Sequence, residues 1–95
     1  MNETDLREQV QRAEEAKALL ENELLGEAFV SLRARYEAAW RDSEPGQAQQ
    51  REELYYAQRA VDHVQQELLI LLDNGKVAAE RLADIERKRD GADNR

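Results

Sequence analysis

Two stretches of the chain carry apolar residues at alternating spacings of three and four, and one strong turn separates them. The first stretch has Leu25, Phe29, Leu32, Tyr36 and Ala39 at these positions. The second stretch has Leu54, Ala57, Val61, Val64, Leu68 and Leu71. Such spacing keeps apolar residues on one side of an α-helix. Between the stretches, residues 42–47 read DSEPGQ, a sequence that stops a helix and lets the chain reverse. The pattern predicts an antiparallel helical hairpin of helices over about 23–41 and 48–74.

A further helix is expected before the hairpin, over about residues 5–21. Apolar residues recur there at helical spacing, and Asp5 with Glu8 fits a capping pattern at its start. Asn22 is a good N-cap residue, and Gly26 is poor inside a helix. We therefore expect a break near Asn22, between this helix and the next.

A short helix is expected after the hairpin, over about residues 76–89. Gly75 follows Asn74 at the point where a glycine commonly ends a helix. Residues 90–95 are expected to form a frayed tail. The chain would then hold a single helical domain over residues 1–89.

Composition supports an all-α fold. The chain has 95 residues, with only 4 Gly and 1 Pro, which is too little turn chemistry for an all-β protein. Ala, Leu, Glu, Gln and Arg dominate, and all are good helix formers. The expected fold is an antiparallel helical hairpin with a preceding helix and a short C-terminal helix.

The charge limits the classes of partner. The formal net charge is −7, which disfavours a general affinity for nucleic acid or anionic membranes. Residues 76–95 are the exception, with five acidic and six basic residues and a net charge of +1. No apolar run approaches the ~18 residues that span a bilayer, so we expect no membrane partner. The absence of cysteine excludes disulfides and thiolate chemistry, and a reducing cytoplasm is compatible with it.

The run Leu68–Leu72 consists of five consecutive apolar residues. One helical stripe cannot cover five neighbours, because successive residues point about 100° apart. Folding over the turn places Leu32 opposite Ala57, and the run opposite residues 17–21. The first helix would then cover one side of the run, and other copies of the chain, or a partner, would cover the rest. The expected oligomer interface comprises Leu68, Leu69, Ile70, Leu72, Leu19 and Leu20.

We expect no catalytic, cofactor or metal site, and no small-molecule substrate. His63 is the only histidine and lacks the additional ligands that a metal would require. Paired carboxylates such as Glu52 and Glu53 are adjacent and do not share a helix face. They are better explained as a solvated surface.

Two clusters leave alternatives open. Trp40 and neighbouring tyrosines and arginines near the turn either bind nucleic acid or a peptide, or close the hairpin with arginine stems over the rings. The basic run Arg87, Lys88 and Arg89 either contacts DNA or an acidic partner, or complements the dipole at the end of a helix.

The stretches AKALLENELLGEAFVSLRARYEAAWRDS and LLDNGKVAAERL resemble small helical proteins encoded in tailed-phage and prophage gene clusters. The resemblance covers roughly residues 13–83, and it rests on the apolar alternation, the Trp-then-turn feature and the Gly-Lys pair. The expected hairpin is similar to the oligomerisation core of phage small terminase subunits, which assemble as rings. That family usually adds an N-terminal helix-turn-helix domain for DNA, and residues 1–21 contain no such unit.

The resemblance implies a non-enzymatic, self-associating DNA-packaging component in the cytoplasm of the host bacterium. Its partners would be the large terminase subunit and non-specific DNA. The alternative is a generic helical adaptor or scaffold that binds another viral or host protein through its apolar face.

Overall fold

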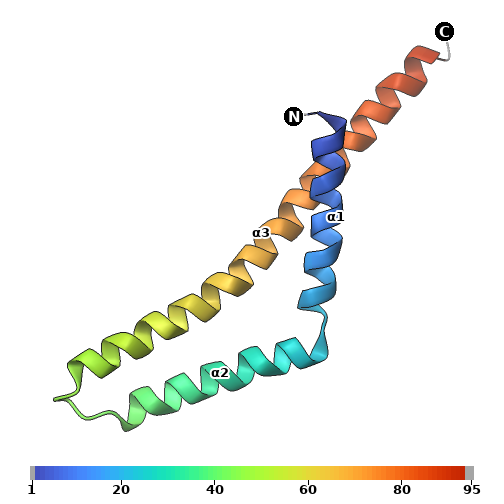
Figure 1. Ribbon diagram of the computed structural model, residues 1–95. Helices are drawn as coiled ribbons and strands as arrows, with labels where there is room; N and C mark the ends of the chain where they lie inside the picture. The colour runs from blue at the N-terminus through green and yellow to red at the C-terminus, as the bar shows by residue number, and fades with distance from the viewer. Residues whose placement is uncertain (1, 94–95) are drawn as a thin grey trace. The chain divides into compact units, whose positions relative to one another are not determined.

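The structure is a computed structural model that describes the backbone of residues 2–93 and the side chains of residues 2–91. The described chain is helical, with α1 (Glu3–Leu20), α2 (Glu23–Asp42) and α3 (Ala48–Asp93) (Figure 1). The expected all-α class is confirmed. Within the described residues, no helix combines the length and the apolar character needed to cross a membrane.

Asn2 caps α1, so the expectation of a cap at Asp5 is wrong. The Asn2 side chain accepts a hydrogen bond from the Asp5 backbone N–H at 2.9 Å. Both residue types are good N-caps, but capping by Asn2 lets the helix begin earlier in the chain and so adds residues to it. Glu3 and Asp5 then lie in the first turn, where a negative charge is favourable.

Asn22 separates α1 from α2, as predicted. Its backbone is extended (φ −69°, ψ 118°), and its side chain accepts a hydrogen bond from the Leu25 backbone N–H at 2.8 Å. The bond satisfies one of the backbone donors that every helix start leaves unpaired.

The expected stop at Gly75 is wrong, because α3 continues through it to Asp93. A glycine stop requires a left-handed backbone, and no described residue has a positive φ. Gly75 instead faces α1, where a Cβ atom added to it would lie 2.0 Å from the Ala13 Cβ. The expected helix over 76–89 is therefore part of α3. Residues 90–93, expected to fray, are helical, and 94–95 lie outside the described residues.

The contacts divide the chain into two compact units, to both of which α3 contributes. Unit 1 comprises Met1–Leu19 and Leu68–Arg95, and unit 2 comprises Leu20–Glu67. The prediction of a single domain over residues 1–89 stays a prediction.

Unit 1 contains the buried side chains, and most of them are small. Leu6, Ala13 and Ala16 of α1 and Ala78 of α3 are buried, at 1–7% exposure. Small residues let two helix axes approach closely, and Gly75 lies at the point of contact. The run Leu68–Leu72 was expected opposite residues 17–21, which pairs Leu72 with residue 17. Leu72 and Lys17 do line the same shallow hollow.

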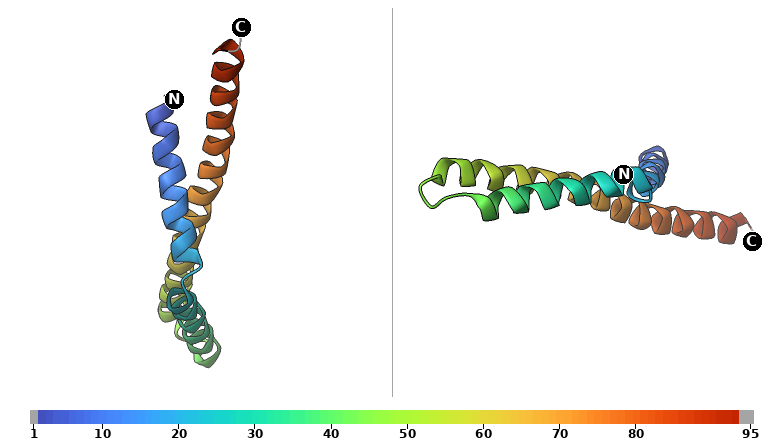
Figure 2. Two further views of the ribbon diagram at one scale, coloured as in Figure 1. Left: turned by 90° about the vertical axis from the view of Figure 1, so that its right-hand side faces the viewer. Right: turned by 90° about the horizontal axis from the view of Figure 1, so that it is seen from below.

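Unit 2 contains α2 and the first part of α3, which lie side by side (Figures 1 and 2). Four predicted contact residues of α2 are half-buried, namely Leu25, Phe29, Leu32 and Tyr36. Ala39, the fifth, is exposed. No residue of unit 2, which is described throughout, is buried.

The predicted pairing within unit 2 needs correction. Arg33 contacts Asp62 and Gln65, whereas the prediction places Leu32 opposite Ala57. The same folding places residue 56 opposite Arg33, so its two partners lie six and nine residues farther along α3. Val64, expected in the contact, is 53% exposed, and Gln65 takes the half-buried position and bonds to Arg33. The hydrogen bond from the Arg33 guanidinium replaces hydrogen bonds to water that the Gln65 amide loses on burial. This is why an amide side chain can occupy the half-buried position.

Candidate interaction surfaces

The run Leu68–Leu72 lies in unit 1 and is covered on one side. Leu72 lines a hollow with Val10, Ala13 and Gly75, so α1 lies over its side of α3. Leu69 and Ile70 remain 50% and 43% exposed. Leu68 and Leu71 are half-buried. α1 therefore leaves two large apolar side chains of the run open to solvent.

The other two predicted interface residues belong to different units. Leu19 is in unit 1 and is 48% exposed, and Leu20 is in unit 2 and is half-buried. Leu19, Leu69 and Ile70 therefore belong to the same unit, and all three are exposed apolar residues. Whether they form an interface stays a prediction.

The turn end of unit 2 is held together by Arg51. Its Nε donates to the Ser43 Oγ at 2.6 Å, and an NH2 group donates to the Ser43 carbonyl at 3.1 Å. The guanidinium carbon lies 5.4 Å from the centre of the Trp40 ring, within the range of a cation–π contact. The closing role anticipated for an arginine over this ring is therefore present at Arg51.

The aromatic residues of the turn end still reach solvent. Trp40 is 42% exposed, and Tyr55 and Tyr56 are 51% and 61% exposed. The two tyrosine rings meet edge to face with centres 5.7 Å apart. Exposed Trp, Tyr and Arg are the residue types that dominate binding energy at protein interfaces.

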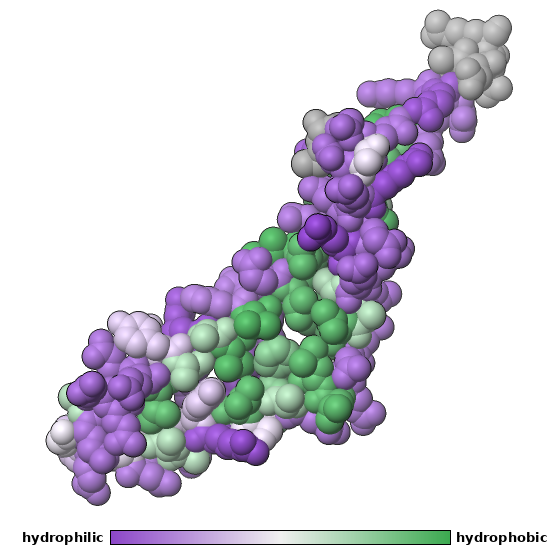
Figure 3. Space-filling model, in the orientation of Figure 1, coloured by the Kyte–Doolittle hydropathy of each residue, from purple (hydrophilic) through white to green (hydrophobic). Residues whose placement is uncertain are grey.

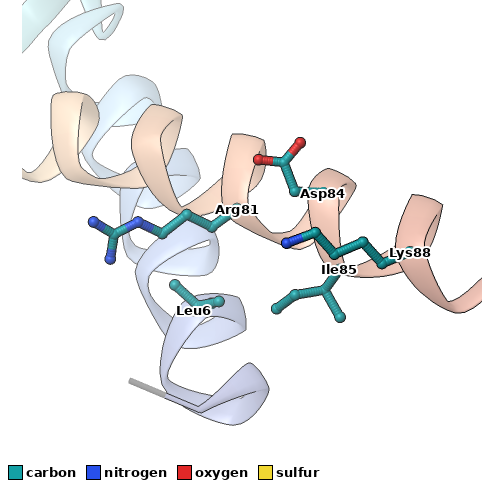
Figure 4. Close-up of a pocket in the computed structure, with 5 residues that line it drawn as sticks. All are labelled: Leu6, Arg81, Asp84, Ile85 and Lys88. Atoms are coloured by element: carbon teal, nitrogen blue, oxygen red, sulfur yellow. The ribbon is translucent and has the colours of Figure 1, made fainter.

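The basic run lies at the far end of unit 1, and two of its members contact acids. Arg87 contacts Asp84, and Arg89 contacts Glu3 of α1. Figure 4 shows Leu6 and Ile85 pointing into the space between α1 and α3, with Lys88 and Arg81 extending along α3. These pairs are exposed and hence weak, typically about 0–1 kcal/mol. They still offset much of the positive charge that a phosphate would meet.

Several exposed apolar residues of unit 2 were not singled out as site residues. Leu24 is 74% exposed, Val30 67% and Val64 53%. Figure 3 shows hydrophobic side chains between α2 and the first part of α3, whereas the visible part of α1 is mostly hydrophilic. The signal was present in the sequence, because Leu24 and Ala28 directly precede the contact residues Leu25 and Phe29.

His63 is exposed, and in the described part of the chain no three His, Asp or Glu side chains are placed to share a metal ion. Comparison of the chain with protein-family models, curated proteins and solved structures finds no significant match.

Proposed function

We propose that this protein is a non-enzymatic helical protein that works by self-association. One observation carries the proposal: among residues 2–91, Leu6 is the only large apolar side chain that is buried. The other large apolar residues are half-buried or exposed despite their regular helical spacing. Regular apolar spacing without burial is typical of helices that pack against further helices.

The energetics support the proposal. Full burial of a Leu or Ile side chain contributes about 1.5–3 kcal/mol. A folded domain is stable by only about 5–15 kcal/mol in total. Leu19, Leu69 and Ile70 are each about half exposed, so their remaining burial represents about 2–4 kcal/mol, a substantial part of that stability. Contact between copies recovers that contribution.

The proposed interface comprises Leu68, Leu69, Ile70, Leu72, Leu19 and Leu20. Within unit 1, α1 already contacts α3 near Leu72, so Leu69 and Ile70 are the central contact residues of the proposal. Apolar surface on two different sides of a chain allows heterologous contacts, which close into a ring when the rotation permits.

The test of self-association is the native mass in solution, measured by light scattering or native mass spectrometry. We expect one dominant species of several copies. A stable monomer across the concentration range would contradict the proposal, since Leu69 and Ile70 would then need no cover.

The resemblance to phage small terminase subunits extends the proposal to DNA packaging. In that role the assembled protein binds the large terminase subunit, and Arg87, Lys88, Arg89 and Trp40 contact the partner or non-specific DNA. The extension rests on the resemblance alone. The pairing of Arg87 and Arg89 with acids weighs against strong phosphate contact.

The packaging extension is tested by binding of double-stranded DNA at physiological salt, measured by fluorescence anisotropy. If DNA binds through the basic run, changing Arg87, Lys88 and Arg89 to Glu abolishes binding, because each lost phosphate contact weakens affinity. The matched control changes three exposed arginines elsewhere, Arg12, Arg41 and Arg59, to Glu. Absence of binding by the unaltered protein removes the packaging extension and leaves self-association untouched.

The alternative function, a helical adaptor for another protein, is favoured by the exposed aromatic residues at the turn end of unit 2. Trp40, Tyr55 and Tyr56 lie within one unit, and Arg51 lies over the Trp40 ring. A monomer in solution would make this alternative the leading one.

A further inference from the structure

The helix pair of unit 2 has two open sides, and one contact identifies them. Arg33 directly follows the half-buried Leu32, and Asp62 directly follows the half-buried Val61. The Arg33 Nε donates to the Asp62 Oδ1 at 3.2 Å. Successive helix residues are rotated by about 100°. The half-buried contact residues are Leu25, Phe29, Leu32 and Tyr36 of α2 and Leu54, Gln58, Val61 and Gln65 of α3. In an antiparallel pair, residues that directly follow a contact residue therefore lie on the side of Arg33 and Asp62 in both helices. Residues that directly precede one, such as the half-buried Ala57, lie on the opposite side.

The two sides differ in composition. The side of Arg33 and Asp62, the polar side, carries Gly26, Val30, Arg33, Glu37, Tyr55, Arg59, Asp62 and Gln66. The opposite side, the apolar side, carries Leu24, Ala28, Ser31, Arg35, Glu53, Ala57, Ala60 and Val64. Five of the eight positions on the apolar side are aliphatic, and three of those are alanines that present no bulk to an approaching helix.

The apolar side is open to solvent. Leu24 and Val64 are 74% and 53% exposed, Ala28 and Ala60 are exposed, and Ala57 is half-buried. The polar side in contrast is bridged between helices by Arg33, which contacts both Asp62 and Gln65. A flat apolar surface on one side of a helix pair is what a second helix layer covers in a four-helix bundle.

We infer that the apolar side of unit 2 is covered by the same side of unit 2 in a second copy. The inference rests on the proposed self-association and names a surface for it that is separate from the Leu69–Ile70 surface. Every copy has the same uncovered side, and a two-fold contact covers both at once. The side carries one cation, Arg35 on α2, and one anion, Glu53 on α3. The net charge of this side is therefore zero, whereas the whole chain has a net charge of −7. Repulsion between like charges, which opposes contact between copies, is accordingly absent from this side.

Charge is complementary in such a contact. A two-fold rotation that lays α2 of one copy over α3 of the other brings the helix with Arg35 toward the helix with Glu53. Like charges face each other only if α2 lies on α2, and α3 on α3, of the other copy. The charges of these two residues therefore favour the four-helix arrangement in which α2 of one copy lies on α3 of the other.

The test compares Ala60→Glu on the apolar side with Gln66→Glu on the polar side. Both positions are exposed on α3, and both changes add one negative charge. We expect Ala60→Glu to raise the concentration at which copies dissociate by at least about tenfold, equivalent to ~1.4 kcal/mol, and Gln66→Glu to leave it unchanged. The readout is mass against concentration, with helicity followed by circular dichroism.

A cross-linking measurement covers the case in which Ala60→Glu loses helicity. The chain has no cysteine, so Ala60→Cys and Gln66→Cys each introduce a single thiol. With α2 of one copy over α3 of the other, the two α3 helices lie diagonally, about 11–14 Å apart when packed neighbours are about 8–10 Å apart. In Ala60→Cys the thiols of both copies point into the layer between the copies, which shortens the span to one that a bismaleimide of about 10 Å can bridge. We expect cross-linked dimers from Ala60→Cys and few from Gln66→Cys.

Equal behaviour of the two positions would overturn the inference. If Ile70→Glu dissociates the protein while Ala60→Glu does not, self-association stands and the apolar side of unit 2 is not its surface. If the unaltered protein is a monomer, both proposals fail together.

Discussion

Gly75 and Gly26 both lie inside α-helices, but only Gly75 meets a neighbouring helix. A Cβ added to Gly75 would lie 2.0 Å from the Ala13 Cβ and 3.1 Å from the Gln9 carbonyl oxygen. A Cβ added to Gly26 would meet nothing within 4 Å. The two glycines therefore provide a matched pair that separates intrinsic helix propensity from packing.

We predict that Gly75→Ala destabilises the protein and Gly26→Ala stabilises it. At Gly75 the new methyl group forces α1 and α3 apart, and such overpacking costs typically about 1–3 kcal/mol. At Gly26 the change improves helix propensity by about 0.5–1 kcal/mol without a clash. Urea unfolding followed by circular dichroism, at one protein concentration, measures both. Stabilisation by both changes would show that α1 does not approach Gly75 closely.

At the scale of elements, Arg51 connects the end of α2 to the start of α3. It bonds to both the side chain and the carbonyl of Ser43 and lies over the Trp40 ring. Ser43 in turn caps α2, since its Oγ donates to the Trp40 carbonyl at 2.6 Å. One side chain thus joins a helix end, a turn and an aromatic ring.

We predict that Arg51→Ala loosens this turn and lowers stability by about 1–2 kcal/mol, from its lost hydrogen bonds and ring contact. The estimate is at the low end for a charged group because the bonds are only partly buried. Trp40 is the only tryptophan, so its fluorescence reports the turn directly. Arg59→Ala, an exposed arginine on the same helix, is the control. Unchanged Trp40 emission in Arg51→Ala would contradict the contact.

At the scale of the whole molecule, the proposed assembly depends on Leu69 and Ile70. We predict that Leu69→Glu and Ile70→Glu each raise the dissociation concentration by at least about tenfold while helicity is largely kept. A carboxylate that enters an apolar interface without a partner loses its hydration uncompensated. Both residues are about half exposed in one chain, so the chain itself accommodates the change.

The measurement is native mass against concentration, and Ala83→Glu is the control. Ala83 is exposed on the same helix and outside the proposed surface. If both variants keep the mass of the unaltered protein, the assignment of Leu69 and Ile70 to an interface is wrong.

Local features were predictable from the sequence where the cause was local. The turn over 42–47 and the cap at Asn22 depend on residues within a few positions of each other, and both are present. Asn2 was missed because the sequence holds two adequate caps close together, and propensity does not rank them. Val64 was misplaced because the apolar pattern cannot anticipate that Gln65 finds a hydrogen-bond partner in Arg33.

The sequence by itself determined that this chain is helical and where its turn and its first break lie. These features follow from spacing and from short-range hydrogen bonds. Only the tertiary structure decided that α3 is continuous through Gly75, and that α1 lies against it there. The physical reason is that a glycine ends a helix or admits a neighbouring helix with equal ease. Which of these it does depends on residues more than sixty positions away in the chain.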